Sequence, residues 1–262
     1  MGEKIFQVDA FTSEPFKGNP AGVLLLTTAK PDEWMQDFAR EMNLSETAYL
    51  LKLQEKYLLR WFTPKVEVDL CGHATLASAH VLFSEGLVKK DETILFESAS
   101  GILKARYVDG WVELDFPAFE VSSGEVTSQI IDALGFEPGE IFESDVNLLV
   151  EMKNHDLVRD YLPDIEKLAM LPYQGLIITS RMEGGYDFTS RYFAPQAGIN
   201  EDPVTGSAHC SLAPFWSSKL GKNELKAYQA SERGGVLRVR LENNRAFIRG
   251  QAVTIFEGEL RI

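Results

Sequence analysis

Two glycines, Gly72 and Gly206, each open a segment of small residues with helical spacing. The first N–H groups of a helix have no partner within the helix, so they can bind an anion without a cationic side chain. A glycine at such a place could also serve only to let a strand turn tightly into a helix. Because the arrangement occurs twice, the sequence favours two helix starts that bind an anionic ligand.

Polar side chains accompany both glycines. His73 follows the first, and Asp202 and Ser207 flank the second. Taken singly, each has a plainer explanation: a structural histidine, a turn residue before proline, and a helix cap. It is their convergence on the two helix starts that indicates a functional surface.

A carboxylate at the start of a strand is a further candidate. Glu46 stands between Ser45 and an apolar strand pattern, where partial burial would suit it to proton transfer. The alternative is a solvated surface charge, which the 39 acidic residues of the chain favour on composition alone. The residue pattern by itself leaves both interpretations open.

The residues around the glycines belong to an internal repeat. Residues 60–64 (Arg-Trp-Phe-Thr-Pro) precede 71–74, and residues 191–195 (Arg-Tyr-Phe-Ala-Pro) precede 205–208. The two arginines are 191 − 60 = 131 positions apart, half of the 262 residues. The shared order of strand, proline, loop, glycine and small-residue helix favours a duplication, and therefore two similar lobes.

Short strands dominate the expected elements, because apolar residues alternate in most segments. The expected strands are 6–10, 21–26, 47–53, 57–63, 93–97, 102–108, 111–116, 147–152, 175–179, 188–193, 236–241, 246–249 and a final strand. The expected helices are 31–42, 74–83, one ending near Leu134, and one after Gly206.

The composition is that of a soluble globular protein, with 45% apolar and 25% charged residues. A net charge of −13 at pH 7 repels phosphate backbones and anionic lipids, so we expect no nucleic-acid or membrane partner. The first residues lack the features of a signal peptide, and the two cysteines, Cys71 and Cys210, show no metal-ligand spacing of the CxxC kind. We therefore expect a cytoplasmic protein without a bound metal.

Five ordered motifs resemble the PhzF family of phenazine-biosynthesis isomerases, nearly from end to end. The motifs are 7–11, 15–21, 43–47, 71–75 and 202–208. The resemblance implies a mixed α/β (α+β) fold of the diaminopimelate-epimerase type, with two pseudo-symmetric lobes, each a curved, mostly antiparallel sheet around a central helix. It implies lobes at 1–117 and 118–252, the final strand near 253–262 completing the first lobe, and an active site in the cleft between the lobes.

The same resemblance implies an isomerase without metal or organic cofactor, which moves a proton within a small, cyclic or amino-bearing carboxylic acid. The best-understood family member acts in this way on trans-2,3-dihydro-3-hydroxyanthranilate. By this carry-over Glu46 is the acid/base residue, supported by His73 and Asp202. The substrate-contact residues would be Asn19, Ser45, Gly72, Gly206 and Ser207. The family also usually forms homodimers.

Two other functions stay open. Diaminopimelate epimerase and proline racemase, which share the fold, use paired cysteines. Cys71 resembles the first of that pair, but Thr205 stands where the second would be, so an amino-acid racemase that uses Cys71 is the second choice. A family member that binds a small molecule without turnover is the third, and the intact set of polar site residues argues against it.

Overall fold

The computed structural model describes residues 2–261 and has a mixed α/β architecture rich in strands. The chain divides into two compact units: unit 1 holds the residues up to 116 and those from 247 onward, and unit 2 holds residues 117–246. Within residues 2–261, no helix is both long enough and apolar enough to cross a lipid bilayer. The first and last strands of the described chain both lie in unit 1 and pair with each other.

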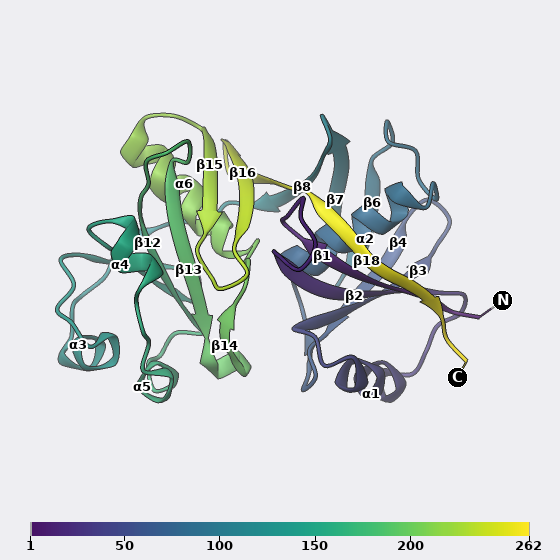
Figure 1. Ribbon diagram of the computed structural model, residues 1–262, viewed down its shortest axis with the longest axis horizontal. Coiled ribbons are helices and arrows are strands. Elements are labelled where there is room, and N and C mark those ends of the chain that lie inside the picture. Colours follow the sequence, from purple (N-terminus) through teal and green to yellow (C-terminus); the bar gives the residue numbers. More distant parts are fainter. Residues whose placement is uncertain (1, 262) are drawn as a thin grey trace. The chain divides into compact units, whose positions relative to one another are not determined.

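Unit 1 is built from nine strands among the residues described. They are β1 (Lys4–Ala10), β2 (Asn19–Leu26), β3 (Glu46–Lys52), β4 (Tyr57–Phe62), β5 (Glu67–Val68), β6 (Ile94–Ser98), β7 (Gly101–Val108), β8 (Trp111–Pro117) and β18 (Ala252–Glu259). The pairing runs β18, β1, β2, β3, β4, β6, β7, β8, and only β2–β3 and β4–β6 are parallel. In Figure 1 the yellow β18 lies along the purple β1, so the end of the chain extends the sheet that its beginning starts.

Unit 2 repeats this arrangement. Its strands are β9 (Ser122–Ser123), β10 (Ile141–Ser144), β11 (Asn147–Glu151), β12 (Gly175–Arg181), β13 (Phe188–Ala194), β14 (Ile199–Asp202), β15 (Glu224–Gln229) and β16 (Gly235–Glu242), and β17 (Arg245–Gly250) leads back to unit 1. The pairing runs β9, β10, β11, β12, β13, β15, β16, and only β11–β12 and β13–β15 are parallel.

The two sheets therefore follow one plan, strand by strand. In each unit, the first two pairs of neighbouring strands in the order given above are antiparallel. The next four pairs are parallel, antiparallel, parallel and antiparallel in turn. In each sheet a short strand, β5 or β14, also pairs antiparallel with the strand that carries the repeated arginine. The expected pseudo-symmetric, mostly antiparallel fold is confirmed.

Each unit also contains one long, almost fully buried helix, α2 (Gly72–Ser84) in unit 1 and α6 (Ala208–Leu220) in unit 2. Nearly every residue of α2 is buried, including Ala74, Ala77 and Ala79, because small side chains let the strands approach the helix closely. The helix expected after Gly206 is present. Its first helical residue is Ala208, because Gly206 and Ser207 form the turn that precedes it.

Pro214 lies inside α6 and removes one N–H from the helix. The carbonyl that this N–H would have bonded belongs to Cys210, four residues earlier. The Cys210 carbonyl instead accepts a bond from the Phe119 N–H, at 2.9 Å. The helix therefore contains a proline without leaving a buried acceptor unpaired.

Helix α1 (Asp32–Met42) covers part of the unit 1 sheet, as its apolar spacing predicts. Its Met35 and Phe38 pack against Tyr49 of β3, and the Tyr49 hydroxyl donates to the Met35 carbonyl at 2.5 Å. Phe38 and Tyr49 meet edge to face, with ring centroids 6.5 Å apart. Such an aromatic pair adds about 0.5–1.5 kcal/mol beyond the burial of its area.

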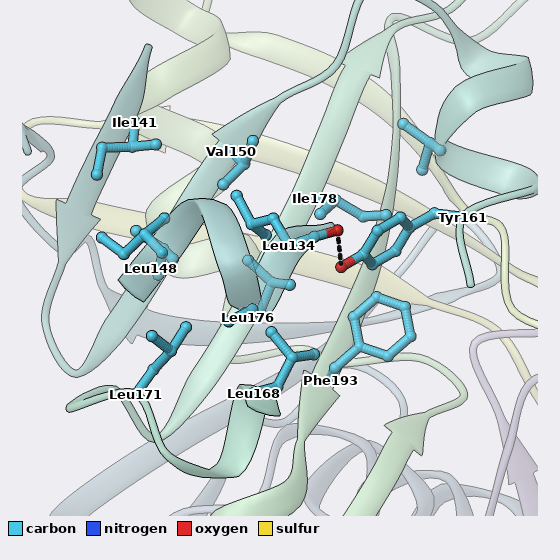
Figure 2. Close-up of a cluster of buried hydrophobic side chains, with 13 residues drawn as sticks. Leu134, Ile141, Leu148, Val150, Tyr161, Leu168, Leu171, Leu176, Ile178 and Phe193 are labelled. Carbon is cyan, nitrogen blue, oxygen red and sulfur yellow. Dashed lines mark hydrogen bonds between the residues drawn. The ribbon is translucent and has the colours of Figure 1, made fainter. Parts of the chain in front are cut away.

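The core of unit 2 includes side chains of three short helices, α3 (Ser128–Leu134), α4 (His155–Arg159) and α5 (Ile165–Ala169), whereas the 3₁₀ turn η1 (Pro195–Ala197) buries none. Figure 2 shows their buried side chains around Ile178 and Phe193 of the sheet. There the Tyr161 hydroxyl donates to the Leu134 carbonyl at 3.2 Å, which satisfies one of the last carbonyls of α3.

Candidate active site

The polar residues of unit 1 that the motifs single out gather where β2, β3 and α2 begin. Strands β2 and β3 are parallel, and Ala21 is opposite Glu46, so Asn19 and Glu46 lie at the same edge of the sheet. The Ser45 hydroxyl donates to Oδ1 of the fully buried Asn19 at 3.2 Å. This bond ties the loop before β3 to the first residue of β2, and so fixes the backbone from which Glu46 projects.

Glu46 and His73 form a buried ion contact. Oε2 of Glu46 lies 3.1 Å from Nε2 of His73, and the residues are only 8% and 3% exposed. The bond angles do not meet hydrogen-bond geometry, so neither atom has a hydrogen-bond partner among residues 2–261. The interpretation of Glu46 as a solvated surface charge is wrong, because the strand start that carries it is covered.

Cys71 contacts the other side of the same imidazole ring. Its Sγ lies 3.5 Å from Nδ1 of His73. Burial, reinforced by the negative charge of Glu46, raises the pKa of the Cys71 thiol to about 11, so the thiol is neutral near pH 7. The imidazole therefore lies between a neutral thiol and a carboxylate.

The environment of His73 favours its protonated form. Burial disfavours charge on the ring, but the contacts with Cys71 and Glu46 outweigh burial and hold the pKa of His73 well above its ordinary value. Since the thiol is neutral at pH 7, we assign most of this effect to the Glu46 carboxylate. At neutral pH the cluster therefore contains a protonated His73 ring beside a neutral thiol.

The start of α2 adds backbone donors to this cluster. The first bond within the helix runs from the Thr75 N–H to the Cys71 carbonyl, at 3.2 Å. The N–H groups of Gly72, His73 and Ala74 precede that bond, and within the described chain no side chain caps them from the N-cap position. Their partial positive charge suits a ligand carboxylate, as the sequence predicts.

Unit 2 carries a second polar group at the end of β14. The buried Asp202 carboxylate accepts a bond from the Thr205 hydroxyl at 2.5 Å. The side chain of Gln229, at the end of β15, accepts from the Thr205 N–H at 2.8 Å and donates to the Asp202 carbonyl at 2.9 Å. Gln229 thus holds both ends of the turn that carries Asp202.

Gly206 and Ser207 continue this turn into α6. The bonds from His209 N–H to the Gly206 carbonyl (3.0 Å) and from Cys210 N–H to the Ser207 carbonyl (2.9 Å) tighten the first turn. Ser207 occupies the N-cap position of α6. Its side chain makes no capping bond with any residue the structure describes, so the interpretation of its hydroxyl as a helix cap is wrong. Nδ1 of His209 lies 2.8 Å from the Thr205 carbonyl.

The structure thus arranges the eight predicted site residues in two groups, one in each unit. Unit 1 holds Asn19, Ser45, Glu46, Gly72 and His73, and unit 2 holds Asp202, Gly206 and Ser207. Their catalytic and binding roles stay predictions. Gln229 was not predicted as a site residue. The pattern that could have indicated it is the alternation in β15, where Gln229 follows Leu225 and Ala227 on the buried face.

Three side chains of unit 1 could also hold a metal ion. One ligand atom each of Glu46, Cys71 and His73 lies within 4.8 Å of the other two, and all three residues are buried. The sequence predicts no metal ligands, because it lacks the CxxC spacing and Glu46 lies 25 positions before Cys71 (71 − 46 = 25).

Comparison with known proteins gives the same family along the whole chain. The model of the PhzC-PhzF family, "Phenazine biosynthesis-like protein", matches residues 8–258. An uncharacterised isomerase of Pseudomonas aeruginosa is 49% identical over 262 residues and covers 100% of both chains. Another, from Halalkalibacterium halodurans, is 48% identical over 99% of both chains.

Solved structures agree with these relatives. A PhzF-family protein from Enterococcus faecalis has a TM-score of 0.95 and 41% identity over 100% of both chains. A probable proline racemase from Agrobacterium radiobacter has a TM-score of 0.69 at 11% identity, covering 99% of this chain and 93% of that one. At that identity the second likeness shows the shared fold alone.

Proposed function

Because the chain belongs to the PhzC-PhzF family of phenazine biosynthesis-like proteins, we propose that it is an isomerase that needs no cofactor. It would move a proton within a small carboxylic acid, cyclic or amino-bearing, by acid/base catalysis at Glu46. The curated relatives named above carry the description isomerase, which supports the reaction class.

One observation carries the proposal: the Glu46 carboxylate is buried, and its Oε2 lies 3.1 Å from the His73 ring. Burying a carboxylate is costly unless a partner offsets its charge, and His73 is the partner here. If position 46 served only to pack the core, an apolar side chain there would make the fold more stable. A retained, partly unpaired carboxylate instead suits a group that must accept and return a proton.

The reaction balances with one carboxylate. Glu46 accepts a proton from a carbon next to a conjugated system, and the electron pair of that C–H bond moves into the π system. The double bond shifts, and the carboxylic acid returns the proton to another carbon on the same face. Nothing is oxidised or reduced, and a positioned acid/base group contributes about 10²–10⁴ in rate.

His73 and the start of α2 would govern the charge of the bound substrate. The His73 ring, 3.1 Å from Glu46, would offset the charge of a carboxylate there, and the N–H groups at Gly72 would bind the carboxylate of the substrate. These donors are local, which matters because the net charge of −13 repels an anion at long range.

Asp202, Gly206 and Ser207 would bind and orient the substrate, as the family resemblance implies. The Thr205 hydroxyl and Gln229 fix the turn that carries Asp202, so this carboxylate is held in one orientation. A group that is held in this way suits selective recognition of an amino or hydroxyl substituent.

The racemase alternative requires Cys71 to act as a base. With a thiol pKa of about 11, the thiolate is a fraction of about 10⁻⁴ at pH 7. The corresponding position in unit 2 is Thr205, which cannot supply the second base. We therefore place the chemistry on Glu46.

Proton NMR and ultraviolet absorbance in heavy water test the proposal. The wild type and Glu46→Gln are incubated with a panel of unsaturated cyclic and amino carboxylic acids that includes dihydrohydroxyanthranilate. Both probes are needed, because a proton that is passed internally leaves no deuterium. We expect double-bond migration or deuterium uptake that falls by about 10²–10⁴ in Glu46→Gln.

The exposed Glu55 supplies the matched control, since Glu55→Gln makes the same chemical change outside the site. Turnover that survives in Glu46→Gln at the level of Glu55→Gln would refute the assignment of the base. If a compound of the panel binds but neither wild type nor control changes it, the binding-protein alternative replaces the isomerase.

A further inference from the structure

We propose that Glu46, Cys71 and His73 form a binding site for a thiophilic divalent cation, with Zn²⁺ as the best fit. The three donors are a thiol sulfur, an imidazole nitrogen and a carboxylate oxygen, and each belongs to a different side chain of unit 1. The site would regulate the reaction proposed above: an ion held there occupies the carboxylate that moves the proton. Only this regulatory consequence rests on the proposed function.

The spacing of the donor atoms suits a single ion. With bonds of about 2.3 Å to sulfur and about 2.0–2.2 Å to nitrogen and oxygen, the donors of a tetrahedral zinc site lie about 3.3–3.7 Å apart. One ion can use only one nitrogen of the His73 ring, and with Nε2 as that nitrogen its separation from Glu46 Oε2 is 3.1 Å, whereas Cys71 Sγ now lies 3.5 Å from the other nitrogen, Nδ1. All three ligand atoms lie within 4.8 Å of one another, so side-chain rotations alone can close the site.

Two of these donors are buried and lie 3.1 Å apart as an ion pair, without a hydrogen bond between them. Oε2 of Glu46 and Nε2 of His73 lack a hydrogen-bond partner in the described chain, although both residues are more than nine-tenths buried. Buried polar atoms are normally satisfied, because each unmet bond costs about 1–3 kcal/mol. An ion bound to Nε2 and Oε2 would satisfy both, with the Cys71 sulfur turned toward it as the third ligand.

The charges also balance. Zn²⁺ bound to a thiolate, a carboxylate and a neutral imidazole gives a cluster with no net charge. Binding releases to solvent the proton of Cys71 Sγ and any proton on the coordinating nitrogen of His73. A buried, low-dielectric place tolerates such a neutral cluster better than one with a net charge.

The donor set selects among metals. Mg²⁺ and Ca²⁺ prefer oxygen ligands only, so a sulfur and a nitrogen among three donors disfavour both ions. Zn²⁺ and Co²⁺ accept sulfur, nitrogen and oxygen together, and three protein ligands leave a fourth position for water or a substrate group. Cys71 and His73 stand at the start of α2, and Glu46 at the start of β3, so rigid elements hold the ligands.

Cobalt titration tests the site without reference to any substrate. The protein is stripped with a chelator, then titrated with Co²⁺ while thiolate-to-cobalt absorption is recorded in the near ultraviolet, and Zn²⁺ is added to displace the cobalt. We expect one equivalent of Co²⁺ with a thiolate band in the wild type, and loss of this band in Cys71→Ser. In Glu46→Gln the thiolate band should remain while binding weakens.

Cys210→Ser is the matched control, because Cys210 is also buried but lies in unit 2. It should bind Co²⁺ as the wild type does, and circular dichroism should show all variants folded. The site is refuted if folded wild type shows no thiolate band, or if Cys71→Ser binds Co²⁺ with the wild-type spectrum. His73→Gln gives a second check, since it should weaken binding while the thiol is intact.

The effect of Zn²⁺ on turnover is measured in a separate assay. The metal site and the isomerase activity can therefore be refuted independently of each other. Metal binding without turnover of any panel compound would leave the site standing and count against the isomerase. Turnover that saturating Zn²⁺ leaves unchanged, in a protein that shows the cobalt band, would refute the regulatory consequence alone.

Discussion

Arg60 and Arg191 occupy equivalent places in the two repeats and share two contacts, a paired bond to a glutamate and a stacked phenylalanine ring, while Arg60 also bonds Asp32 at 2.7 Å. Arg60 forms two parallel bonds to Glu67, both of 2.7 Å, and its guanidinium lies 5.1 Å from the Phe62 ring. Arg191 forms the same two bonds to Glu201, of 2.7 and 2.8 Å, and lies 4.9 Å from the Phe193 ring. The sequence repeat is therefore also a repeat of side-chain geometry.

The two arginines should nevertheless contribute unequally to stability. The Arg191 side chain is 10% exposed against 25% for Arg60, and its Nη1 also donates to the carbonyls of Val158, Arg159 and Tyr161. Removing one partner of a buried pair typically costs about 3–5 kcal/mol, whereas exposed pairs contribute about 0–1.

We therefore expect Arg191→Ala to lower the free energy of unfolding by about 3–5 kcal/mol in urea titrations, and Arg60→Ala by about 1 kcal/mol. Arg40→Ala, which removes a 60%-exposed partner of Asp37, is the control and should change stability little. Equal losses at positions 60 and 191 would contradict the role given to the three carbonyl bonds.

The sequence predicts the order of strands and central helices because the same order occurs in both halves of the chain. The arginine, proline and glycine motifs recur at half-chain spacing, and most strands alternate strongly enough to be placed. The segment around α4 and α5 was missed, since five-residue helices are too short to show a period. The one sequence feature that indicates these helices is an N-cap residue at each start. The Asn154 side chain accepts from the Leu157 N–H, and the Asp164 side chain accepts from the Lys167 N–H.

The site was predictable in its residues and not in its contacts. The motifs point to Glu46 and His73, but composition favours a solvated glutamate, and only the paired strand starts show that Glu46 is buried. Gln229 went unnoticed because β15 itself was missed, although Leu225 and Ala227 alternate with polar residues. Contacts between residues that are far apart along the chain depend on strand pairing, which no local pattern gives.

His209 should make unit 2 sensitive to acid. Burial lowers the pKa of His209 from 6.5 to about 4, and the ring packs beside Phe188. Between these values the unfolded chain binds a proton that the folded protein does not, so stability falls as the pH drops from about 6.5 toward 4. The free energy of unfolding falls by about 1.4 kcal/mol for each pH unit in this range. Above pH 6.5 the protein keeps this part of its stability in full.

Urea unfolding of the wild type and His209→Gln between pH 4.5 and 7 isolates this effect. The stability difference between the two proteins should shrink by about 1.4 kcal/mol for each unit below pH 6.5, because glutamine does not titrate. Phe188→Leu, which disturbs the same packing without changing a titratable group, should show a constant difference. A constant difference for His209→Gln would mean that the imidazole keeps its ordinary pKa.

Gln229 should act as a positioning residue for Asp202. It is fully buried, and Gln229→Leu leaves the Thr205 N–H and the Asp202 carbonyl without this partner. Each such loss costs about 1–3 kcal/mol in the free energy of unfolding. Gln129→Leu, at an exposed glutamine whose side chain donates to the Met170 carbonyl at 3.1 Å, should cost less than about 0.5 kcal/mol.

A purely structural role would lower stability and leave catalysis intact. We expect Gln229→Leu, studied well below its melting temperature, to lower kcat/KM by about ten-fold or more as the Asp202 carboxylate loses its fixed orientation. Unchanged kinetics in folded Gln229→Leu would show that the orientation of Asp202 is not needed for the reaction.

Cys71 and Glu46 provide the sharpest separation between the isomerase and the racemase. If Glu46 moves the proton, Cys71→Ala alters only the group beside Nδ1 of His73, and kcat should fall by no more than about ten-fold. Glu46→Gln should reduce kcat by about 10²–10⁴ in the same assay. The reverse order, with Cys71→Ala inactive and Glu46→Gln active, would assign the chemistry to the thiol.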